Sequence, residues 1–230
     1  MKQLRTKAIV LKRIDYGEAD RIMTLLTSDY GKIRVMARGA RKQKSKLAGG
    51  IELFSVSDMH FIKGRGEIDT LVSTRLDVHY GAIVRDLSRT ELAYTILKSV
   101  HKTVEDNAGS DYFDLVQESF VVLNNVDFPL EIAEASFTMR MIELLGHMPE
   151  LRTNESGQPL DQDKLFEFDF DKISFFLQED GRYNKNHLKV LKLLAHNPPG
   201  RLRQVQGMGR YVHELLPLIR TIRGQFIPGN

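Results

Sequence analysis

The chain has 230 residues, of which 42% are hydrophobic and 27% are charged, and its formal net charge is +3. This composition is typical of a globular protein with room for one large or two small domains. The chain contains no cysteine, which excludes disulfides, thiolate zinc sites and cysteine nucleophiles. No apolar run approaches the roughly 20 residues that span a bilayer. Because the first residues lead into a strand pattern and not into a signal-peptide core, we expect a cytoplasmic protein without a membrane partner.

Charge is distributed unevenly along the chain. Cations outnumber acids in residues 1–80 and again in residues 187–230, whereas acids outnumber cations in residues 81–186. Two basic ends favour contact with a polyanion. Alternatively, the basic ends and the acidic middle neutralise each other within the fold.

The first 80 residues have the pattern of a β domain. Short alternating segments separated by turn residues predict five strands, over residues 7–14, 21–27, 32–37, 51–62 and 68–78. In the first strand, Ile9 and Leu11 fall on one face and Ala8 and Val10 on the other. Five short strands with frequent turns predict a small barrel or sandwich, and the OB-fold is one such barrel.

A cationic segment lies between the third and fourth predicted strands. Residues 38–46, RGARKQKSK, contain five cations and no acid. Lysine and arginine in such a loop displace the counterions condensed on a phosphate backbone, which gives sequence-independent and salt-sensitive binding. The alternative is a solvated loop that only aids solubility.

Four aromatic residues of this β domain are candidates for stacking on bases. Tyr16 and Tyr30 lie in predicted turns, where their rings can be exposed beside cations, as base stacking requires. Phe54 and Phe61 lie within the strand alternation, so we expect them in the core.

From about residue 81 the pattern becomes helical. We expect helices over residues 88–104, 111–124, 129–146 and 187–196, the first of them starting at a capping box of Ser88 and Glu91. Two short strands are expected over residues 165–170 and 173–178, and a basic helical tail that Pro217 interrupts follows residue 200. The fold class is therefore α+β, with a β domain over 1–80 and a mainly helical domain over 81–230 that carries a hairpin insert at about 147–186.

Cations gather again in the C-terminal helices. They are Lys189, Lys192, Arg201, Arg203, Arg210, Arg220 and Arg223. Three interpretations stay open: an extension of a nucleic-acid track, compensation of helix dipoles, and pairing with the acidic middle of the chain.

Signatures of catalysis are weak. The chain lacks a G-x-x-x-x-G-K-[ST] phosphate loop, and Gly64-Arg65-Gly66 lacks the third glycine of a dinucleotide fingerprint, so it is read as a turn. No two histidines have the i, i+4 spacing of a helical metal site. Asp15, Glu18 and Asp20 could hold a divalent cation, although a capped turn is the better interpretation. We therefore expect a protein that is not an enzyme.

Several short segments together resemble the RecO family of bacterial recombination mediators. They are Asp15-Tyr16-Gly17-Glu18-Ala19-Asp20-Arg21, Gly31, Ala37-Arg38-Gly39-Ala40-Arg41, Ser45-Lys46-Leu47-Ala48-Gly49, Phe54 and Gly64-Arg65-Gly66. Their order and spacing match across the first domain. Leu144-Leu145-Gly146 at a helix end is similar to the second half of the family.

The resemblance implies an N-terminal OB-fold followed by a helical domain. It implies binding of single- and double-stranded DNA, annealing of complementary strands, and, with RecR, loading of RecA onto DNA coated by the single-strand-binding protein SSB, in the cytoplasm at the nucleoid. The residues expected to contact DNA are Arg34, Arg38, Arg41, Lys42, Lys44, Lys46 and Arg65.

Two further expectations follow from the resemblance. Many members carry a four-cysteine zinc module after the Leu-Gly helix end, and because this chain has no cysteine we expect no zinc and no other cofactor there, but a hairpin closed by packing alone. The helical domain of the family receives the acidic C-terminal tail of SSB, for which the candidates are Phe137, Arg140 and Leu144. The alternative is that Phe137 belongs to the core and Arg140 is a solvated charge.

Other functions remain open from the sequence. One is a protein-interaction scaffold whose charged segments bind acidic proteins, and another is an RNA-binding OB protein of translation. A metal-dependent nuclease that uses Asp15, Glu18 and Asp20 is a weaker alternative.

Overall fold

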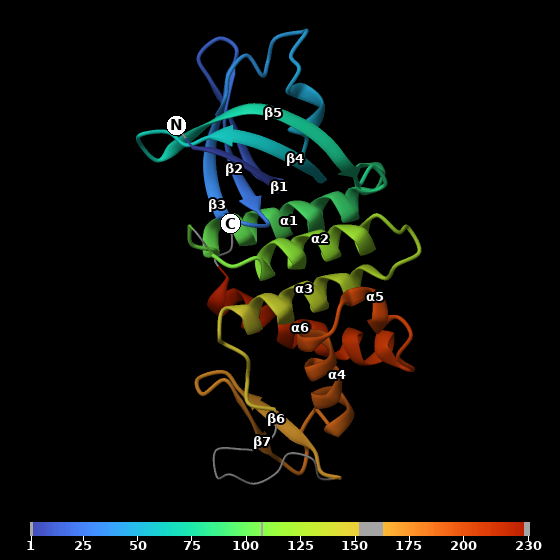
Figure 1. The fold of residues 1–230 in the computed structure, drawn as a ribbon. Coiled ribbons are helices and arrows are strands. Elements are labelled where there is room, and N and C mark those ends of the chain that lie inside the picture. The colour runs from blue at the N-terminus through green and yellow to red at the C-terminus, as the bar shows by residue number, and fades with distance from the viewer. Residues whose placement is uncertain (1, 107, 152–162, 228–230) are drawn as a thin grey trace. The chain divides into compact units, whose positions relative to one another are not determined.

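The computed structural model describes residues 2–106, 108–151 and 163–227 of the chain. The chain divides into two compact units, Met1–Val126 and Asp127–Asn230, and Figure 1 labels the helices and strands of each. The predicted boundary after residue 80 coincides with the change from strands to helices, whereas the two units divide after Val126. The first unit therefore contains two helices in addition to the strands.

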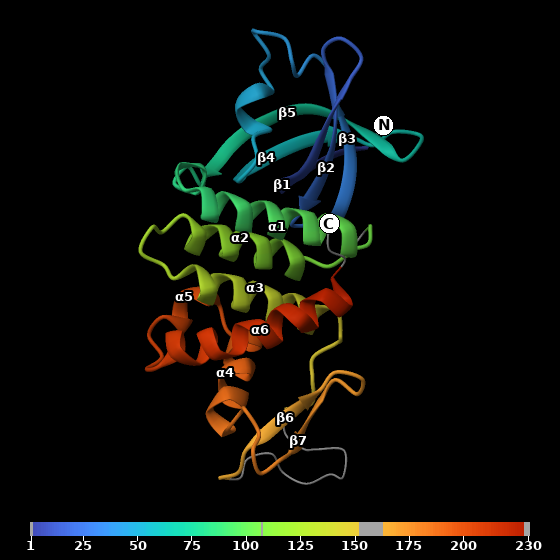
Figure 2. The same ribbon diagram turned by 180° about the vertical axis from the view of Figure 1, so that it is seen from behind.

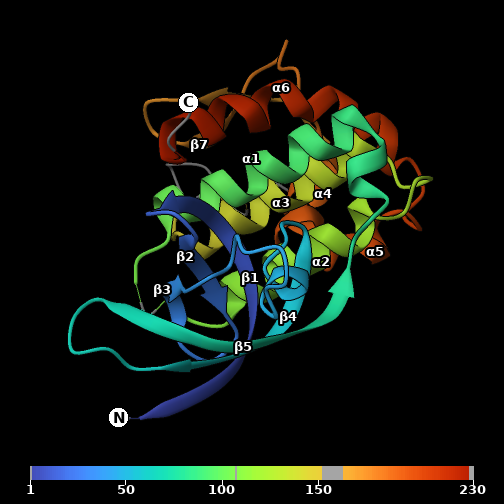
Figure 3. The ribbon, with the colours of Figure 1, turned by 90° about the horizontal axis from the view of Figure 1, so that it is seen from above.

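Five strands form a closed barrel in the first unit, as Figure 3 shows from above. They are β1 (Gln3–Tyr16), β2 (Asp20–Thr27), β3 (Gly31–Ala37), β4 (Ser55–Ile62) and β5 (Ile68–His79). Their order around the barrel is β1-β2-β3-β5-β4, and all neighbours are antiparallel except β3 and β5. This five-stranded barrel confirms the predicted OB-fold.

The barrel core follows from the alternation of side chains along the strands. Met23, Leu25, Val35 and Phe61 are fully buried in it. β1 is buried on both faces, because Ala8 and Val10 join this core while Ile9 and Leu11 are buried outside it. The predicted separation of these four residues onto two faces is confirmed.

Two helices belong to the same unit as the barrel, α1 (Leu87–Thr103) and α2 (Asp111–Leu123). Phe54 connects them to the strands: its ring is 2% exposed and meets Tyr94 of α1 and Phe120 of α2 edge-on, with centroid distances of 5.0 and 5.7 Å. The backbone of Phe54 has φ +55°, a conformation that costs free energy in a bulky residue. The two aromatic contacts offset that cost, and the core positions predicted for Phe54 and Phe61 are confirmed.

The start of α1 differs from the sequence prediction. Asp86 is the N-cap, and its carboxylate accepts the hydrogen bond of the Arg89 backbone N–H at 2.9 Å, so the predicted capping box of Ser88 and Glu91 is wrong. Arg89 is itself buried, and its guanidinium donates to the carbonyls of Leu123 and Asn125 at the end of α2. An aspartate two residues earlier thus fixes where α1 begins, and a buried arginine satisfies the carbonyls where α2 ends.

The second unit is built around α3 (Leu130–Leu144), which packs against α4 (Lys185–His196), α5 (Pro199–Leu202) and α6 (Met208–Phe226). Figure 2 shows α6 alongside α3. The predicted interruption at Pro217 is wrong, because α6 continues through it. Proline removes one intrahelical hydrogen bond, while Leu215, Leu216 and Ile219 are buried around it and hold the helix in place.

A hairpin of β6 (Phe166–Asp169) and β7 (Ser174–Leu177) also belongs to this unit. Both strands match the predicted segments, and part of the predicted insert, residues 152–162, lies outside the described residues. Edge-to-face contacts join Phe168 to Phe175, Phe175 to Tyr183 and Tyr183 to His187 of α4. Aromatic packing therefore ties this hairpin to α4.

Candidate nucleic-acid interface

The outer face of β1, β2 and β3 gathers the residues best suited to a nucleic acid. Strand register places three rows side by side across it: Lys12, Thr24 and Arg34; Ile14, Ile22 and Met36; and Tyr16 and Asp20 beside the end of β3. In OB-folds this face and the loops around it bind oligonucleotides.

The centre of this face is apolar and partly open. Ile14 is 49% exposed and Tyr16 is 56% exposed. Arg34 lies on the same side of β3 as Met36, and Arg38 is exposed directly after the end of that strand. Bases can stack on the exposed aromatic ring and the apolar side chains. The arginines beside them can bind phosphates.

The cationic segment predicted from the sequence, residues 38–46, is called the basic loop below. It is fixed at its base and open at its tip. Gly39 has φ +65°, and its backbone N–H donates to the Asp20 carboxylate at 2.7 Å. Ala40 and Leu47 are buried in the barrel core. The barrel therefore holds both ends of the segment 40–47, and the three lysines between them are exposed.

Four cations of this loop face solvent. Arg38, Lys42, Lys44 and Lys46 are exposed and form no ion pair with any described residue. Arg41 differs, because its guanidinium lies 3.4 Å from the Asp15 carboxylate and its backbone N–H donates to Ala19. The first four can neutralise a ligand, whereas Arg41 chiefly ties the loop to the β1–β2 turn.

Acidic residues at the β1–β2 turn bind the basic loop. The guanidinium of Arg21 donates to Asp15 at 2.9 Å, and this hydrogen bond, with the charges of Arg41, Arg21 and Arg13, holds the pKa of Asp15 below its ordinary value. Asp20 accepts from Gly39. Two of the three carboxylates considered as metal ligands are thus occupied by the protein, and no metal-binding cluster of His, Asp or Glu occurs in the part of the chain that the structure describes.

The remaining predicted DNA contacts are Arg34 of β3 and Arg65 of the β4–β5 turn. Arg34 is exposed and pairs with Glu67, and Arg65 is exposed at the tip of the β4–β5 hairpin. The structure thus places Arg34 on β3 and Arg38 just after its end, whereas Arg65 lies apart in the β4–β5 turn, and a ligand phosphate has to displace Glu67 from Arg34.

Sequence reasoning missed Lys12, Ile14 and Met36 as members of this face. Their signal was the alternation of β1 and β3, but it becomes readable only when the register between strands is known. Lys32, on the same face, has a structural role: its ammonium donates to the carbonyls of His101 and Val104 at the end of α1 and lies 3.7 Å from Asp106.

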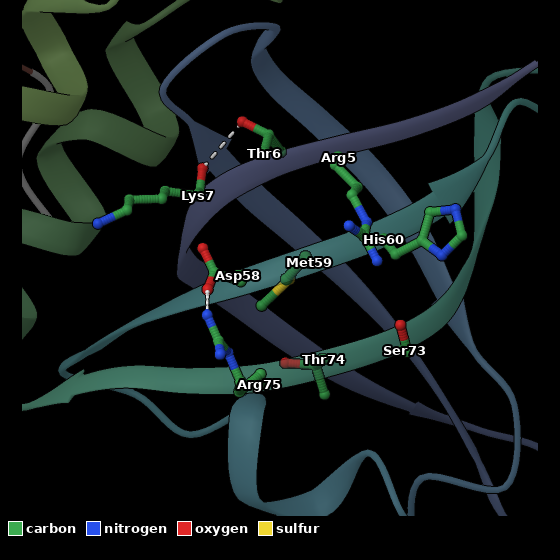
Figure 4. Close-up of a pocket in the computed structure, with 9 residues that line it drawn as sticks. All are labelled: Arg5, Thr6, Lys7, Asp58, Met59, His60, Ser73, Thr74 and Arg75. Carbon is green, nitrogen blue, oxygen red and sulfur yellow. Dashed lines mark hydrogen bonds and ion pairs between the residues drawn. The ribbon is translucent and has the colours of Figure 1, made fainter.

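The opposite outer face of the barrel, across β1, β4 and β5, has a concavity of about 590 Å³. Figure 4 shows its lining, in which Lys7, Asp58 and Arg75 lie near one end and Arg5 and His60 near the other. Lys7 pairs with Asp77 and Arg75 with Asp58, both at 2.7 Å. Because these cations already have carboxylate partners, this face is a poorer polyanion surface than the face of β1, β2 and β3.

The residues predicted to bind a partner lie on α3. Phe137 is 2% exposed, while Arg140 and Leu144 are partly exposed. The ring of Phe137 is therefore not available at the surface of this structure.

The basic C-terminal helices pair in part with acids. Arg220 donates to Glu134 at 2.7 and 2.8 Å, Arg223 lies 3.7 Å from the same carboxylate, and Arg210 pairs with Glu214. Pairing of Arg220 and Arg223 with the acidic middle of the chain, one of the three open interpretations, is thus seen. No helix of the described residues is long and apolar enough to cross a membrane.

Comparison with known proteins gives consistent results. Residues 1–77 match the N-terminal domain of recombination protein O. The chain is 30% identical over 192 residues to the DNA repair protein RecO of Acetivibrio thermocellus. This alignment covers 83% of this chain and 75% of that protein. It is 33% identical over 149 residues to the DNA repair protein RecO of Dehalococcoides mccartyi, covering 64% of this chain and 58% of that protein. In the alignments with several of these RecO proteins, the chain spans only about 60% of the relative's length.

Proposed function

The chain belongs to the RecO family of DNA repair proteins, and we propose that it acts in recombinational DNA repair as a mediator that binds single- and double-stranded DNA. The basic loop and the outer face of β1, β2 and β3 are the proposed contact surface. The observation that carries this proposal is the set of four exposed loop cations without acidic partners among the described residues, held beside the exposed Tyr16 and Ile14.

The proposed mechanism is charge neutralisation. Lysine and arginine on phosphates position a strand without reading its sequence, so the protein accepts any complementary pair. Neutralised strands approach each other more readily, which promotes annealing without nucleotide hydrolysis. We therefore propose a binding protein and not an enzyme.

Partners of this activity are also proposals. With RecR, the protein helps RecA onto DNA coated by SSB. Because Phe137 is buried, the tail of SSB is proposed to reach Arg140 and Leu144, which are partly exposed on α3.

Annealing of SSB-coated strands tests the proposed function. Two complementary oligonucleotides are coated with SSB and mixed with and without the protein, at several salt concentrations and without ATP. We expect acceleration that weakens as salt rises. DNA binding without acceleration would contradict the mediator role, and absence of DNA binding at low salt would contradict the whole proposal.

A further inference from the structure

The second unit has a basic surface of its own. Residues 181–213 contain seven lysines and arginines but no aspartate or glutamate. Three of these cations pair with acids that lie outside this stretch: Arg182 with Glu167, Lys185 with Asp163 and Arg210 with Glu214. The other four form no ion pair with any described residue. These four, called the α4–α5 surface below, are Lys189, Lys192, Arg201 and Arg203.

The two lysines share one side of α4. This helix packs against α3 and buries Leu188, Leu191 and Leu194. Lys189 and Lys192 lie three residues apart on the side turned away from these leucines, where the first is exposed and the second partly exposed. Both ammonium groups are therefore presented to solvent by a helix whose opposite side is fixed in the core.

Lys189 acts on one carboxylate from a distance. The pKa of Asp163 is lowered by the hydrogen bond and the charge of Lys185 and, to a smaller extent, by the charge of Lys189. Lys189 is not within ion-pair distance of this carboxylate, whereas Lys185 is. Its ammonium therefore stays accessible to a ligand.

Two arginines follow on α5. This short helix contacts the end of α4, as Figures 1 and 2 show, and buries Leu202. Arg201 and Arg203 lie on either side of this leucine in the sequence, and both are exposed. Burial of the leucine fixes the local backbone, so the basic surface continues from α4 onto α5.

Compensation of helix dipoles does not account for these cations. The dipole favours cations at a helix C-terminus, and its effect is confined to the first and last turns. Lys189 and Lys192 precede the last turn of α4, where His196 is the basic residue. Arg203 lies in the turn that leads into α6, at the positive end of that helix dipole, and the first turn of α6 contains no acid. A cation there gains nothing from the helix, which leaves it for an anion from outside.

The surroundings of these cations indicate which polyanion they suit. No large apolar side chain of residues 185–227, all of which the structure describes, is exposed. Protein interfaces have a core enriched in aromatic side chains, and unstacked bases are held by exposed aromatic rings. The α4–α5 surface has neither. It can offer only charge, which is sufficient for the phosphates of a duplex.

We propose that the α4–α5 surface is a second DNA site, which binds the phosphate backbone of double-stranded DNA. The barrel face offers Tyr16 and Ile14 to unstacked bases, so the two surfaces suit different forms of DNA. This division fits annealing, in which single strands are the reactants and a duplex is the product. The inference takes its class of ligand from the proposed function, but it places the contact outside the surface proposed there.

Removing the two arginines tests the contact with a duplex. Binding of a labelled duplex to the full chain is measured by fluorescence anisotropy over a series of salt concentrations. Arg201→Ala with Arg203→Ala should flatten the slope of log K against log salt by about 1.8, since each phosphate neutralised on a duplex contributes about 0.9. Between roughly 50 and 200 mM salt, this variant should lose about twelvefold less affinity than the wild type.

The matched control removes two paired arginines of the same unit. Arg182→Ala with Arg210→Ala has the same net charge, but both of these side chains pair with a glutamate, so we expect a near wild-type slope. Thermal unfolding shows whether each variant is folded. An unchanged slope in the folded Arg201 and Arg203 variant, or an equal change in the control, overturns the inference.

A second measurement asks whether the two sites are separate. Wild-type protein saturated with oligo(dT) is titrated with a duplex that carries a fluorescence donor, and the acceptor is on the oligo(dT). We expect energy transfer from a ternary complex in the wild type and its loss in the Arg201 and Arg203 variant, which should keep its affinity for oligo(dT). Full displacement of the duplex by oligo(dT) would mean one shared site and would overturn the inference.

The outcomes separate this inference from the proposed function. Wild-type protein that binds neither form of DNA contradicts the proposed function itself. Duplex binding that is lost on substitution of Lys42 and Lys44, and is unchanged on substitution of Arg201 and Arg203, keeps the proposed function and overturns the second site. Binding of an oligo-glutamate peptide that only the Arg201 and Arg203 variant loses, with duplex binding unchanged, would assign this surface to an acidic protein instead.

Discussion

Removing two cations of the basic loop is the most direct test of the DNA-contact surface. Lys42 and Lys44 are exposed and have no acidic partner among the described residues, so each is available to neutralise a phosphate. For single-stranded DNA, each neutralised phosphate contributes about 0.7 to the slope of log K against log salt. We therefore expect Lys42→Ala with Lys44→Ala to flatten the slope by about 1.4. Between roughly 50 and 200 mM salt, this variant should lose about sevenfold less affinity than the wild type.

The matched control lies on the other side of the same barrel. Lys7→Ala with Arg75→Ala removes the same number of charges, but both of these cations already pair with carboxylates, Asp77 and Asp58. Affinity is measured by fluorescence anisotropy of a labelled oligonucleotide over a series of salt concentrations. An unchanged slope in the loop variant, or an equal change in both variants, would refute the reasoning, since the effect would then be one of net charge and not of position.

Three further predictions concern the scaffold. Gly39→Ala should lower the free energy of unfolding by about 1 kcal/mol, because φ is +65° and a methyl group there meets only Lys42 at ordinary contact distance; Gly49→Ala, in open space, is the near-neutral control in urea denaturation. The folded protein binds the His101 proton more weakly than the unfolded chain, because the pKa of His101 is lowered, so stability should fall as the pH drops through about 6.5; a His101→Asn variant whose deficit is independent of pH would contradict this. Arg89→Met should cost about 3 kcal/mol, because it removes the guanidinium that donates to the buried Leu123 carbonyl and to the partly buried Asn125 carbonyl; a loss below about 1 kcal/mol in urea denaturation would contradict this.

The barrel could be predicted from the sequence because its signals are local. Turn residues separate five alternating segments, and each strand in the structure matches its predicted segment to within a few residues. The basic loop could also be predicted, because a run rich in cations is recognised without knowing which strands lie beside it. What the sequence could not show was that Arg41 would be engaged by Asp15 across the β1–β2 turn, since that pairing depends on the register of two strands.

The errors at helix ends have a different cause. Ser88 and Glu91 fit the local rule for a capping box, yet Asp86 caps α1 because its side chain reaches the Arg89 N–H. Likewise, Pro217 fits the local rule for a break, and buried leucines on either side override it. At α1 two local caps were compatible with the sequence, and the aspartate formed the hydrogen bond; at Pro217 tertiary packing overrode the local rule.

The place of a cation in this fold determines whether it has a partner within the protein or remains available to a ligand. Where an arginine or lysine faces another strand or helix of its own unit, as with Arg21 and Lys32, a carboxylate or a backbone carbonyl meets it, since a partly buried charge without a partner is costly. A loop whose ends are fixed by the barrel can present several cations without such partners, because water solvates them there. Burial of Ala40 and Leu47 in the core is therefore the feature that allows the cations between them to remain available to a ligand.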